Sequence, residues 1–331
     1  MLIEAFSQGK DPAAPEANED QFVILPGRAY AVIDGVTDRL GSRYDGMLSG
    51  RYAAVTLKVA LERRLSAADA PLSDAPALVT HLTDVIASAY RRHDMLERAR
   101  ANAEARFSAT LALVTFDAEA MHITLVGDSG VRINGTEVFQ VDKDLDLITA
   151  TLRQQAWPAI AAATVDPMLR ERLSRLVSFH GLARPAEGLA PHLTRGDLAL
   201  IEAKAVAANI ARLPHVPRAD IESLVRGGIV NAQGGYQNDA STILGYSCLD
   251  GFHVPFELVR TNRFRRADVR TVEVFSDGYF KHGADFGVAA WEKAFEEVER
   301  EDAEKIGRYL SVKGSTSLAS ADDRTYVGVR L

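Results

Sequence analysis

Three short apolar runs in this chain each end in an aspartate with a glycine beside it, and a fourth run begins just after an aspartate. The first three aspartates are Asp34, Asp128 and Asp277, and the fourth is Asp322. Apolar runs of this length, bounded by turn residues, are typical of β-strands. Acids at strand ends can converge at one edge of a sheet. We therefore expect a β-sheet core that presents a cluster of carboxylates.

The strands pair into hairpins by local signals. The runs 21–25 and 29–33 are separated by Pro26-Gly27-Arg28 and should form a hairpin that ends at Asp34-Gly35. A second hairpin over 108–116 and 121–126 should end in Gly127-Asp128-Ser129. Further strands are expected at 2–7, 131–133, 137–140, 198–202, 241–246, 256–261, 271–275 and 325–331.

Helices are expected where apolar residues recur every three or four positions. In the segment 75–105, this spacing is shown by Leu78, Leu82, Val85, Ile86 and Ala89. The other predicted helices cover 45–66, 144–178, 219–226, 287–301 and 303–312. Strands and helices are thus interspersed along the chain.

Composition narrows the class of protein. The chain has 331 residues, of which 47% are hydrophobic, and a net charge of −7. The negative charge argues against nucleic acid as a partner, and the chain contains no apolar run of about 18 residues that would span a membrane. The N-terminus lacks the pattern of a signal peptide. Its single cysteine, Cys248, excludes an intramolecular disulfide and fits a cytoplasmic protein.

The acids suit hard divalent cations, which prefer oxygen ligands. The chain offers Glu19-Asp20, Asp34-Gly35, Gly127-Asp128 and Asp277-Gly278, and glycine lets the backbone approach an ion closely. Any one Asp-Gly taken alone is better explained as a turn. The combination of acids and strand ends favours a metal site. Phosphate-binding and dinucleotide-binding glycine loops are absent from the sequence.

The order of these motifs resembles the metal-dependent protein phosphatases of the protein phosphatase 2C family. The matching motifs are Asn18-Glu19-Asp20, Asp34-Gly35, Gly127-Asp128-Ser129, Ser276-Asp277-Gly278 and Asp322-Asp323-Arg324-Thr325. They span nearly the whole chain. The resemblance implies one domain over 1–331 with a four-layer α-β-β-α sandwich, in which helices flank two antiparallel sheets.

The resemblance also implies roles for individual residues. Asp34 would bridge two Mn²⁺ or Mg²⁺ ions, and the Gly35 carbonyl would bind one of them. Glu19, Asp277 and Asp322 would complete this site, Asp20 would hold a bound water, and Asp128 would serve a third, weaker cation. Asp34 and Asp277 would be the main catalytic residues. A metal-bound hydroxide would attack phosphoserine or phosphothreonine in a phosphoprotein, and the enzyme is expected to be a monomer.

The chain also departs from the family's pattern. Pro15 stands where the family usually has a phosphate-binding arginine, and the candidates to replace it are Lys10, Arg39, Arg43 and Arg51. The segment 141–240 is long, which indicates an insertion or an elaborated flap that tunes substrate choice. Two other functions stay open: a catalytically inactive binding or regulatory module, and a phosphatase of small phosphoesters.

Overall fold

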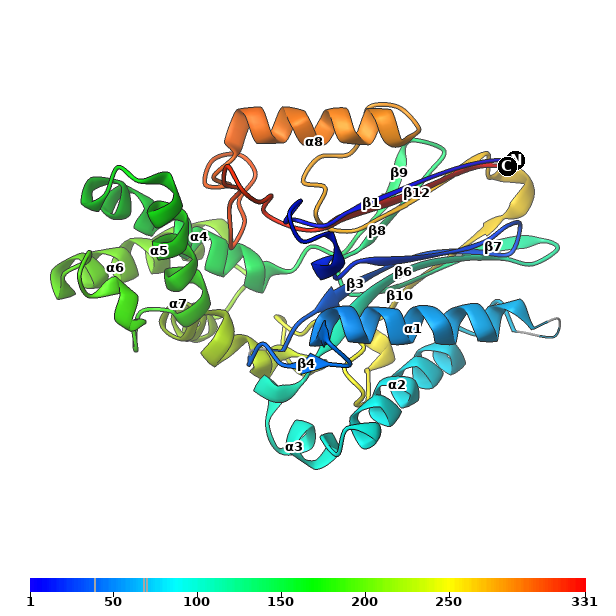
Figure 1. Ribbon diagram of the computed structural model, residues 1–331, viewed down its shortest axis with the longest axis horizontal. Helices are drawn as coiled ribbons and strands as arrows, with labels where there is room; N and C mark the ends of the chain where they lie inside the picture. Colours follow the sequence, from blue (N-terminus) through cyan, green and yellow to red (C-terminus); the bar gives the residue numbers. More distant parts are fainter. Residues whose placement is uncertain (39, 68, 70) are drawn as a thin grey trace.

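The computed structural model, which describes residues 1–38, 40–67, 69 and 71–331, contains two five-stranded antiparallel sheets packed face to face (Figure 1). The first sheet has the order β1 (Leu2–Gln8), β12 (Arg324–Arg330), β11 (Thr271–Phe275), β8 (Gly130–Ile133), β9 (Glu137–Phe139). The second has the order β10 (Arg260–Arg265), β7 (Ala120–Val126), β6 (Ser108–Phe116), β3 (Ala29–Val36), β2 (Gln21–Leu25). Helices cover both outer faces, so the predicted four-layer α+β sandwich is confirmed.

Side-chain alternation along the strands builds two cores. On β3, Tyr30 and Val32 belong to the apolar cluster between the two sheets. Ala31 and Ile33, one position on, belong to the cluster that the second sheet shares with its helices. Both predicted hairpins are confirmed, although β3 continues through Asp34 to Val36.

The outer layers are α8 (Val288–Asp302) on the first sheet, and α1 (Ser49–Ser66) with α2 (Ala75–Arg92) on the second. The predicted helix from residue 45 begins later, because a small hairpin of β4 (Arg43–Tyr44) and β5 (Met47–Leu48) turns at Asp45-Gly46, both with positive φ. The helix predicted over 75–105 breaks at Asp94, where φ is 55°, and resumes as α3 (Leu96–Ala101).

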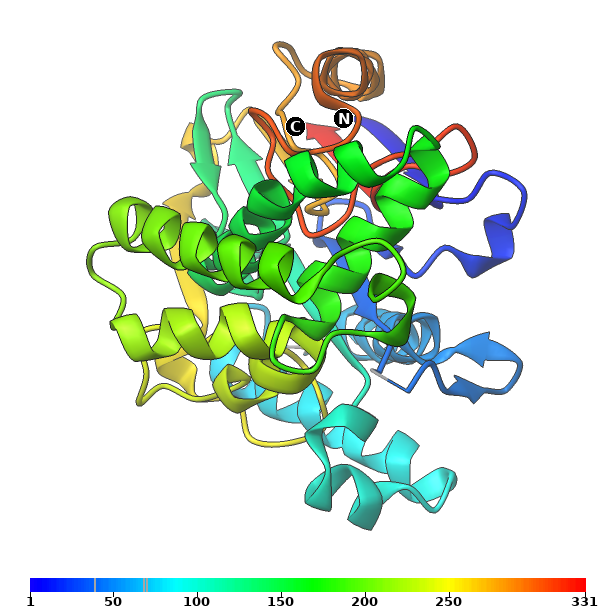
Figure 2. The same ribbon diagram turned by 90° about the vertical axis from the view of Figure 1, so that its left-hand side faces the viewer.

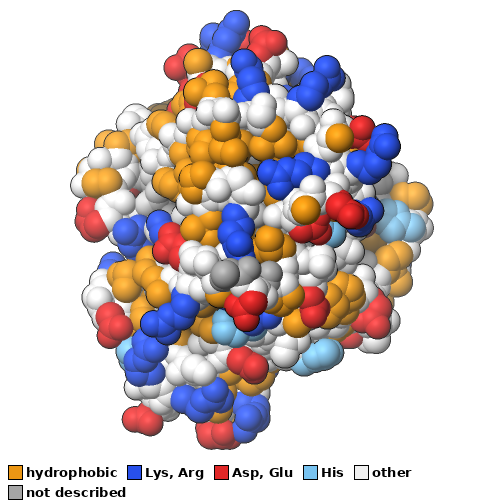
Figure 3. Space-filling view, turned by 90° about the vertical axis from the view of Figure 1, so that its right-hand side faces the viewer, with side chains coloured by type: hydrophobic (Ala, Val, Ile, Leu, Met, Phe, Trp, Pro, Cys, Tyr) orange, Lys and Arg blue, Asp and Glu red, His pale blue; other side chains and the backbone are white. Residues whose placement is uncertain are grey.

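Four helices lie together at one end of the sandwich (Figure 2). They are α4 (Asp144–Ala163), α5 (Pro167–His180), α6 (Arg195–Arg212) and α7 (Arg218–Ala232). They share an apolar cluster of their own, separate from those of the sheets. The opposite end carries both termini, since β1 pairs with β12, and Figure 3 shows acidic and basic side chains interspersed there with hydrophobic ones. In the part of the chain that the structure describes, no helix combines the length and hydropathy needed to cross a bilayer.

Three predicted strands are wrong or displaced. Residues 198–202 lie inside α6, whose start is fixed by a capping box between Thr194 and Asp197. Residues 241–246 form turns, because the Asp239 carboxylate accepts from the Ser241 backbone N–H at 2.9 Å and so bends the chain. The strand predicted at 256–261 begins at Arg260 instead, after a 3₁₀ turn that follows Pro255.

The helix predicted over 303–312 is also wrong. The Asp302 carboxylate accepts backbone hydrogen bonds from Ile306, Gly307 and Tyr309 at 2.9–3.1 Å, which removes those groups from helical pairing. Lys305, which comes between Asp302 and Ile306, adopts a φ of 53°. The chain therefore turns after α8 rather than forming a second helix.

Candidate metal centre

Strand alternation places polar residues at one end of the core between the sheets. On β3, Tyr30 and Val32 face the other sheet, so Asp34 lies on the same face one step further on. On β11, Val274 faces the core and Ser276 follows on that face. The apolar core between the sheets therefore ends in a layer of polar side chains.

Three carboxylates converge in this layer. Asp34, Asp128 and Asp277 each offer an oxygen atom, and these oxygens lie within 4.8 Å of one another. Asp128 is 8% exposed as a residue, and its Oδ1 is buried without a hydrogen-bond partner. A buried acceptor without a donor is unfavourable by about 1–3 kcal/mol, and a cation would satisfy it. The sequence thus located three acids that the fold brings together.

The central carboxylates resist ionisation. Burial first, and then the charges of Asp20, Asp322 and Asp128, raise the pKa of Asp34 well above its usual range. The pKa of Asp277 is raised well above its usual range by burial and by the charges of Asp128, Asp34 and Asp322. A divalent cation among these groups would relieve the repulsion that causes both shifts.

The Glu19-Asp20 pair lies beside this cluster. Asp20 is 2% exposed and accepts a hydrogen bond from the Ser276 hydroxyl at 2.8 Å. Burial, followed by the charge of Asp323, raises the pKa of Asp20 to about 8. Glu19 accepts from the Thr37 hydroxyl and from the Lys10 ammonium, the latter at 3.1 Å. The two neighbouring acids thus differ, since Asp20 accepts from a hydroxyl, whereas Glu19 accepts from both a hydroxyl and an ammonium.

Asp322 and Asp323, the two neighbouring acids of the C-terminal motif, make different contacts. Asp323 accepts from the Lys10 backbone N–H at 2.7 Å, from the Lys10 ammonium at 2.9 Å and from the Glu19 backbone N–H at 3.2 Å. It therefore fixes the loop that carries Glu19. Asp322 is 27% exposed at its side chain and faces Lys313 at 2.8 Å. Burial alone would raise the pKa of Asp322, but the charges of Lys313 and Lys10 outweigh it and lower the pKa.

Two glycines allow the close backbone packing of the cluster. A Cβ at Gly35 would lie 2.3 Å from the Gly50 carbonyl oxygen and 2.8 Å from that of Glu19. A Cβ at Gly278 would lie 1.9 Å from the Asp323 carbonyl oxygen. These positions require glycine for space, which is a stronger reason than turn formation.

Lys143 is a site residue that sequence reasoning missed. Its ammonium lies 2.6 Å from Asp128 Oδ2 and 3.1 Å from Asp146 Oδ2, and 5.4 Å from the centre of the Tyr246 ring. It stands at the start of α4, so the helical end of the molecule contributes a charge to the cluster. Its pKa is raised: burial opposes the ammonium, but Asp128 and Asp146 outweigh burial. A third cation at Asp128, still a prediction, would compete with Lys143.

The candidate residues for phosphate binding differ in the groups that they contact. Lys10 is the one that contacts the acids of the site. Arg43 is exposed and donates to the Gly46 carbonyl at 3.1 Å, and Arg51 donates to the Asn18 carbonyl. Arg39 lies outside the described residues. Lys10 is therefore the best placed of the three described candidates for a phosphate group at the site.

The donor set fits the cations that the sequence predicts. The ligand atoms brought together are carboxylate oxygens, which suit Mn²⁺ and Mg²⁺ and are poor ligands for softer metals. The unpartnered Asp128 oxygen and the raised pKa values of Asp34 and Asp277 both indicate a place for positive charge. The arrangement can therefore hold divalent cations at the end of the sandwich.

No protein-family model and no curated protein matches the sequence. The structure is similar to solved structures of bacterial serine/threonine phosphatases over its full length. With PstP/Ppp of Mycobacterium tuberculosis the identity is 15%, covering 100% of this chain and 99% of that chain, at a TM-score of 0.46. With Stp1 of Staphylococcus aureus the identity is 13%, covering 100% of this chain and 96% of that chain, at a TM-score of 0.44. With the PstP catalytic domain in complex with two manganese ions the identity is 17%, covering 99% of this chain and 96% of that chain, at a TM-score of 0.44.

Proposed function

We propose that this protein is a metal-dependent phosphatase that removes phosphate from phosphoserine and phosphothreonine in proteins. The observation that carries the proposal is the convergence of Asp34, Asp128 and Asp277, with one buried oxygen of Asp128 left without a partner. Oxygen-rich sites of this kind bind two Mn²⁺ or Mg²⁺ ions in many phosphoester hydrolases. The proposal includes action as a monomer in the cytoplasm, as the sequence predicts.

The residues have distinct proposed roles. Asp34 offers an oxygen within 4.8 Å of oxygens of Asp128 and Asp277, and it would be shared between two cations, with the Gly35 carbonyl as a further ligand. Glu19 and Asp322 would complete the metal site as further carboxylate ligands. Asp20 would hold a bound water, and the hydrogen bond from the Ser276 hydroxyl fixes its carboxyl group.

The bound cations would activate a water molecule and neutralise charge on the phosphate. Lys10, with its ammonium beside Glu19 and Asp323, would orient a phosphate oxygen. The polar layer at the end of the sandwich is flanked by buried apolar strands, which strengthen electrostatic interactions by lowering the local dielectric constant.

The test is hydrolysis of an aryl phosphate and of a phosphothreonine peptide, with Mn²⁺ and with a chelator. Asp34→Asn and Asp277→Asn keep side-chain size and should each lower Mn²⁺-dependent turnover by about a hundredfold or more. Asp84→Asn, an exposed position on α2, is the matched control. Wild-type rates in both site variants, or activity that survives chelation, would overturn the proposal.

A second function is favoured by a specific observation, the three ammonium groups among the carboxylates. Lys10, Lys143 and Lys313 already neutralise part of the acidic charge. A non-catalytic binding module could use such lysines in place of metal. Calorimetric titration with Mn²⁺ separates the two, because the module would bind no Mn²⁺ at millimolar concentration and would hydrolyse neither substrate.

A further inference from the structure

A groove adjoins the candidate metal centre on the side of the helical end. It lies between α5 and the segment 313–321, has a volume of about 480 Å³, and includes Lys10 and Lys313 in its lining. Both lysines also contact Asp322, at 3.9 Å from Lys10 and 2.8 Å from Lys313. Two lining lysines of the groove therefore lie next to Asp322 of the candidate metal centre. Its size is in the range of known ligand pockets.

The walls of this groove are held in place by hydrogen bonds. The Gly314 backbone N–H donates to Glu171 Oε1 at 2.8 Å, and the Ser178 hydroxyl donates to the Val312 carbonyl at 2.7 Å. The Ser320 backbone N–H donates to the Lys10 carbonyl at 2.8 Å. These bonds join α5, the segment 313–321 and the N-terminal loop. The groove is thus a formed part of the fold.

The groove is positively charged although the chain carries a net charge of −7. Arg172 and Arg175 lie one helical turn apart on α5, are exposed, and line it together with the two lysines. Among the described residues, Arg172 has no ion pair within 4.0 Å, and the Arg175 guanidinium lies over the Phe179 ring at 5.5 Å from its centre. Two cations are therefore available for a ligand.

The acidic residue of the lining does not cancel this charge. Both oxygens of Glu171 are already bonded, one to Arg153 and the other to the Gly314 backbone N–H. The charges of Lys10 and Lys313 are balanced by the acids of the metal centre. Cations bound there would take over those acids and leave more of the lysine charge to the groove.

We propose that this groove binds acidic residues next to the phosphorylated residue of a protein substrate. The inference rests on the proposed phosphatase function and adds its substrate class. A phosphate at the metal centre places the neighbouring peptide at Lys10 and Lys313, and an aspartate or glutamate further along then reaches Arg172 and Arg175. Arginine suits this task because its planar fork can bind both carboxylate oxygens.

The closing experiment compares phosphothreonine peptides with aspartates, alanines or lysines around the phosphothreonine, with an aryl phosphate as reference. The readout is kcat/KM for the acidic peptide divided by kcat/KM for the aryl phosphate. The double variant Arg172→Glu, Arg175→Glu should lower this ratio about tenfold through KM, since each exposed ion pair contributes little and charge reversal doubles the effect. The loss should shrink at high salt.

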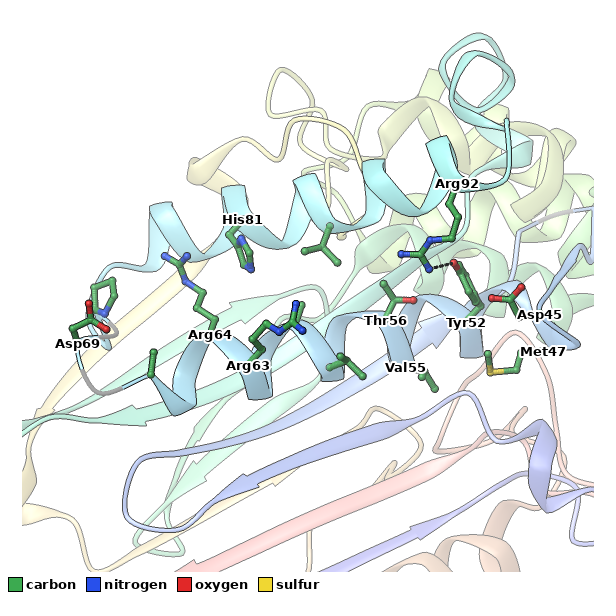
Figure 4. Close-up of a pocket in the computed structure, with 15 residues that line it drawn as sticks. Asp45, Met47, Tyr52, Val55, Thr56, Arg63, Arg64, Asp69, His81 and Arg92 are labelled. Atoms are coloured by element: carbon green, nitrogen blue, oxygen red, sulfur yellow. Dashed lines mark hydrogen bonds between the residues drawn. The ribbon is translucent and has the colours of Figure 1, made fainter.

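The matched control is the double variant Arg63→Glu, Arg64→Glu, which makes the same charge change in a different groove. Arg63 lies on α1 in the groove between α1 and α2, where Arg64, His81 and Arg92 also project (Figure 4). This variant should leave the ratio unchanged. An equal fall in both variants would show an effect of net charge and overturn the proposal, as would a wild-type protein with no preference for acidic peptides.

Binding is measured separately with a fluorescent acidic peptide that carries no phosphate, by anisotropy in the presence of Mn²⁺. Weaker binding by the Arg172, Arg175 double variant than by the Arg63, Arg64 control supports the groove even if no substrate is hydrolysed, in which case the phosphatase function alone fails. Hydrolysis of the aryl phosphate without any effect of Arg172 and Arg175 on either measurement refutes the groove and leaves the phosphatase function intact.

Discussion

The metal-free protein should lose stability as pH rises from 5 to 7, and Asp20 should be one cause. Burial and the charge of Asp323 raise the pKa of Asp20 from 3.8 to about 8. Below pH 4, Asp20 is protonated in the folded and unfolded chains alike. Between pH 4 and 8, folding requires Asp20 to take up a proton, so stability falls as pH rises. Above pH 8, the full unfavourable contribution is present.

The magnitude follows from the width of this window. Each pH unit inside it changes the free energy of unfolding by 1.36 kcal/mol per group, so Asp20 contributes a loss of about 3 kcal/mol between pH 5 and 7. A domain of this size has a stability of about 5–15 kcal/mol, so the change is measurable. Asp20→Asn keeps an oxygen that can accept from Ser276 and removes the ionisation. The free energy of unfolding of this variant should therefore fall by about 3 kcal/mol less than that of the wild type between pH 5 and 7.

Urea denaturation of chelator-treated protein at pH 5, 6 and 7 provides the assay, with Asp84→Asn as the control for an exposed acid. Saturating Mn²⁺ should flatten the wild-type slope, because the cations stabilise the ionised carboxylates. If Asp20→Asn and wild type lose the same stability between pH 5 and 7, the burial of an ionisable Asp20 is not what sets the slope.

Three further outcomes are expected. Lys143→Met should tighten Mn²⁺ binding about tenfold by calorimetry, because the ammonium that competes for Asp128 is gone, whereas the exposed Lys281→Met should not change it. Gly278→Ala should lower the free energy of unfolding by about 1–3 kcal/mol in urea, since its Cβ would overlap the Asp323 carbonyl; wild-type stability would contradict the packing. Asp323→Asn should weaken Mn²⁺ affinity through the Glu19 loop, and unchanged affinity would show that this loop needs no such anchor.

The sequence predicted well what depends on local pattern. The hairpins around Asp34 and Asp128 follow from alternating residues and turn signals, which put each acid at a strand end, where the fold brings both together with Asp277. The helix predicted over 303–312 does not form, because the Asp302 carboxylate accepts hydrogen bonds from backbone N–H groups that a helix would use.

The ion-pair partners of the site acids that lie far away in the chain could not be predicted from the sequence. Lys143 and Lys313 look like ordinary surface lysines in their segments, and only the packing of α4 and of the segment 313–321 brings them to Asp128 and Asp322. No periodicity or spacing encodes such pairs. The separation of Asp322 from Asp323 depends in the same way on Lys10, more than 300 residues earlier in the chain.

The placement of the three lysines favours a metal centre over a non-catalytic module. Lys10 and Lys313 pair with the acids around Asp322, and Lys143 pairs with Oδ2 of Asp128. In the part of the chain that the structure describes, no ammonium or guanidinium pairs with Asp34 or Asp277 within 4.0 Å, and Oδ1 of Asp128 has no hydrogen-bond partner. A module that used lysine in place of metal would also neutralise Asp34 and Asp277, because burial opposes the ionisation of both. Two of the three converging carboxylates are thus left without a paired cation among the described residues, which is the charge distribution expected of a site whose cations come from solution.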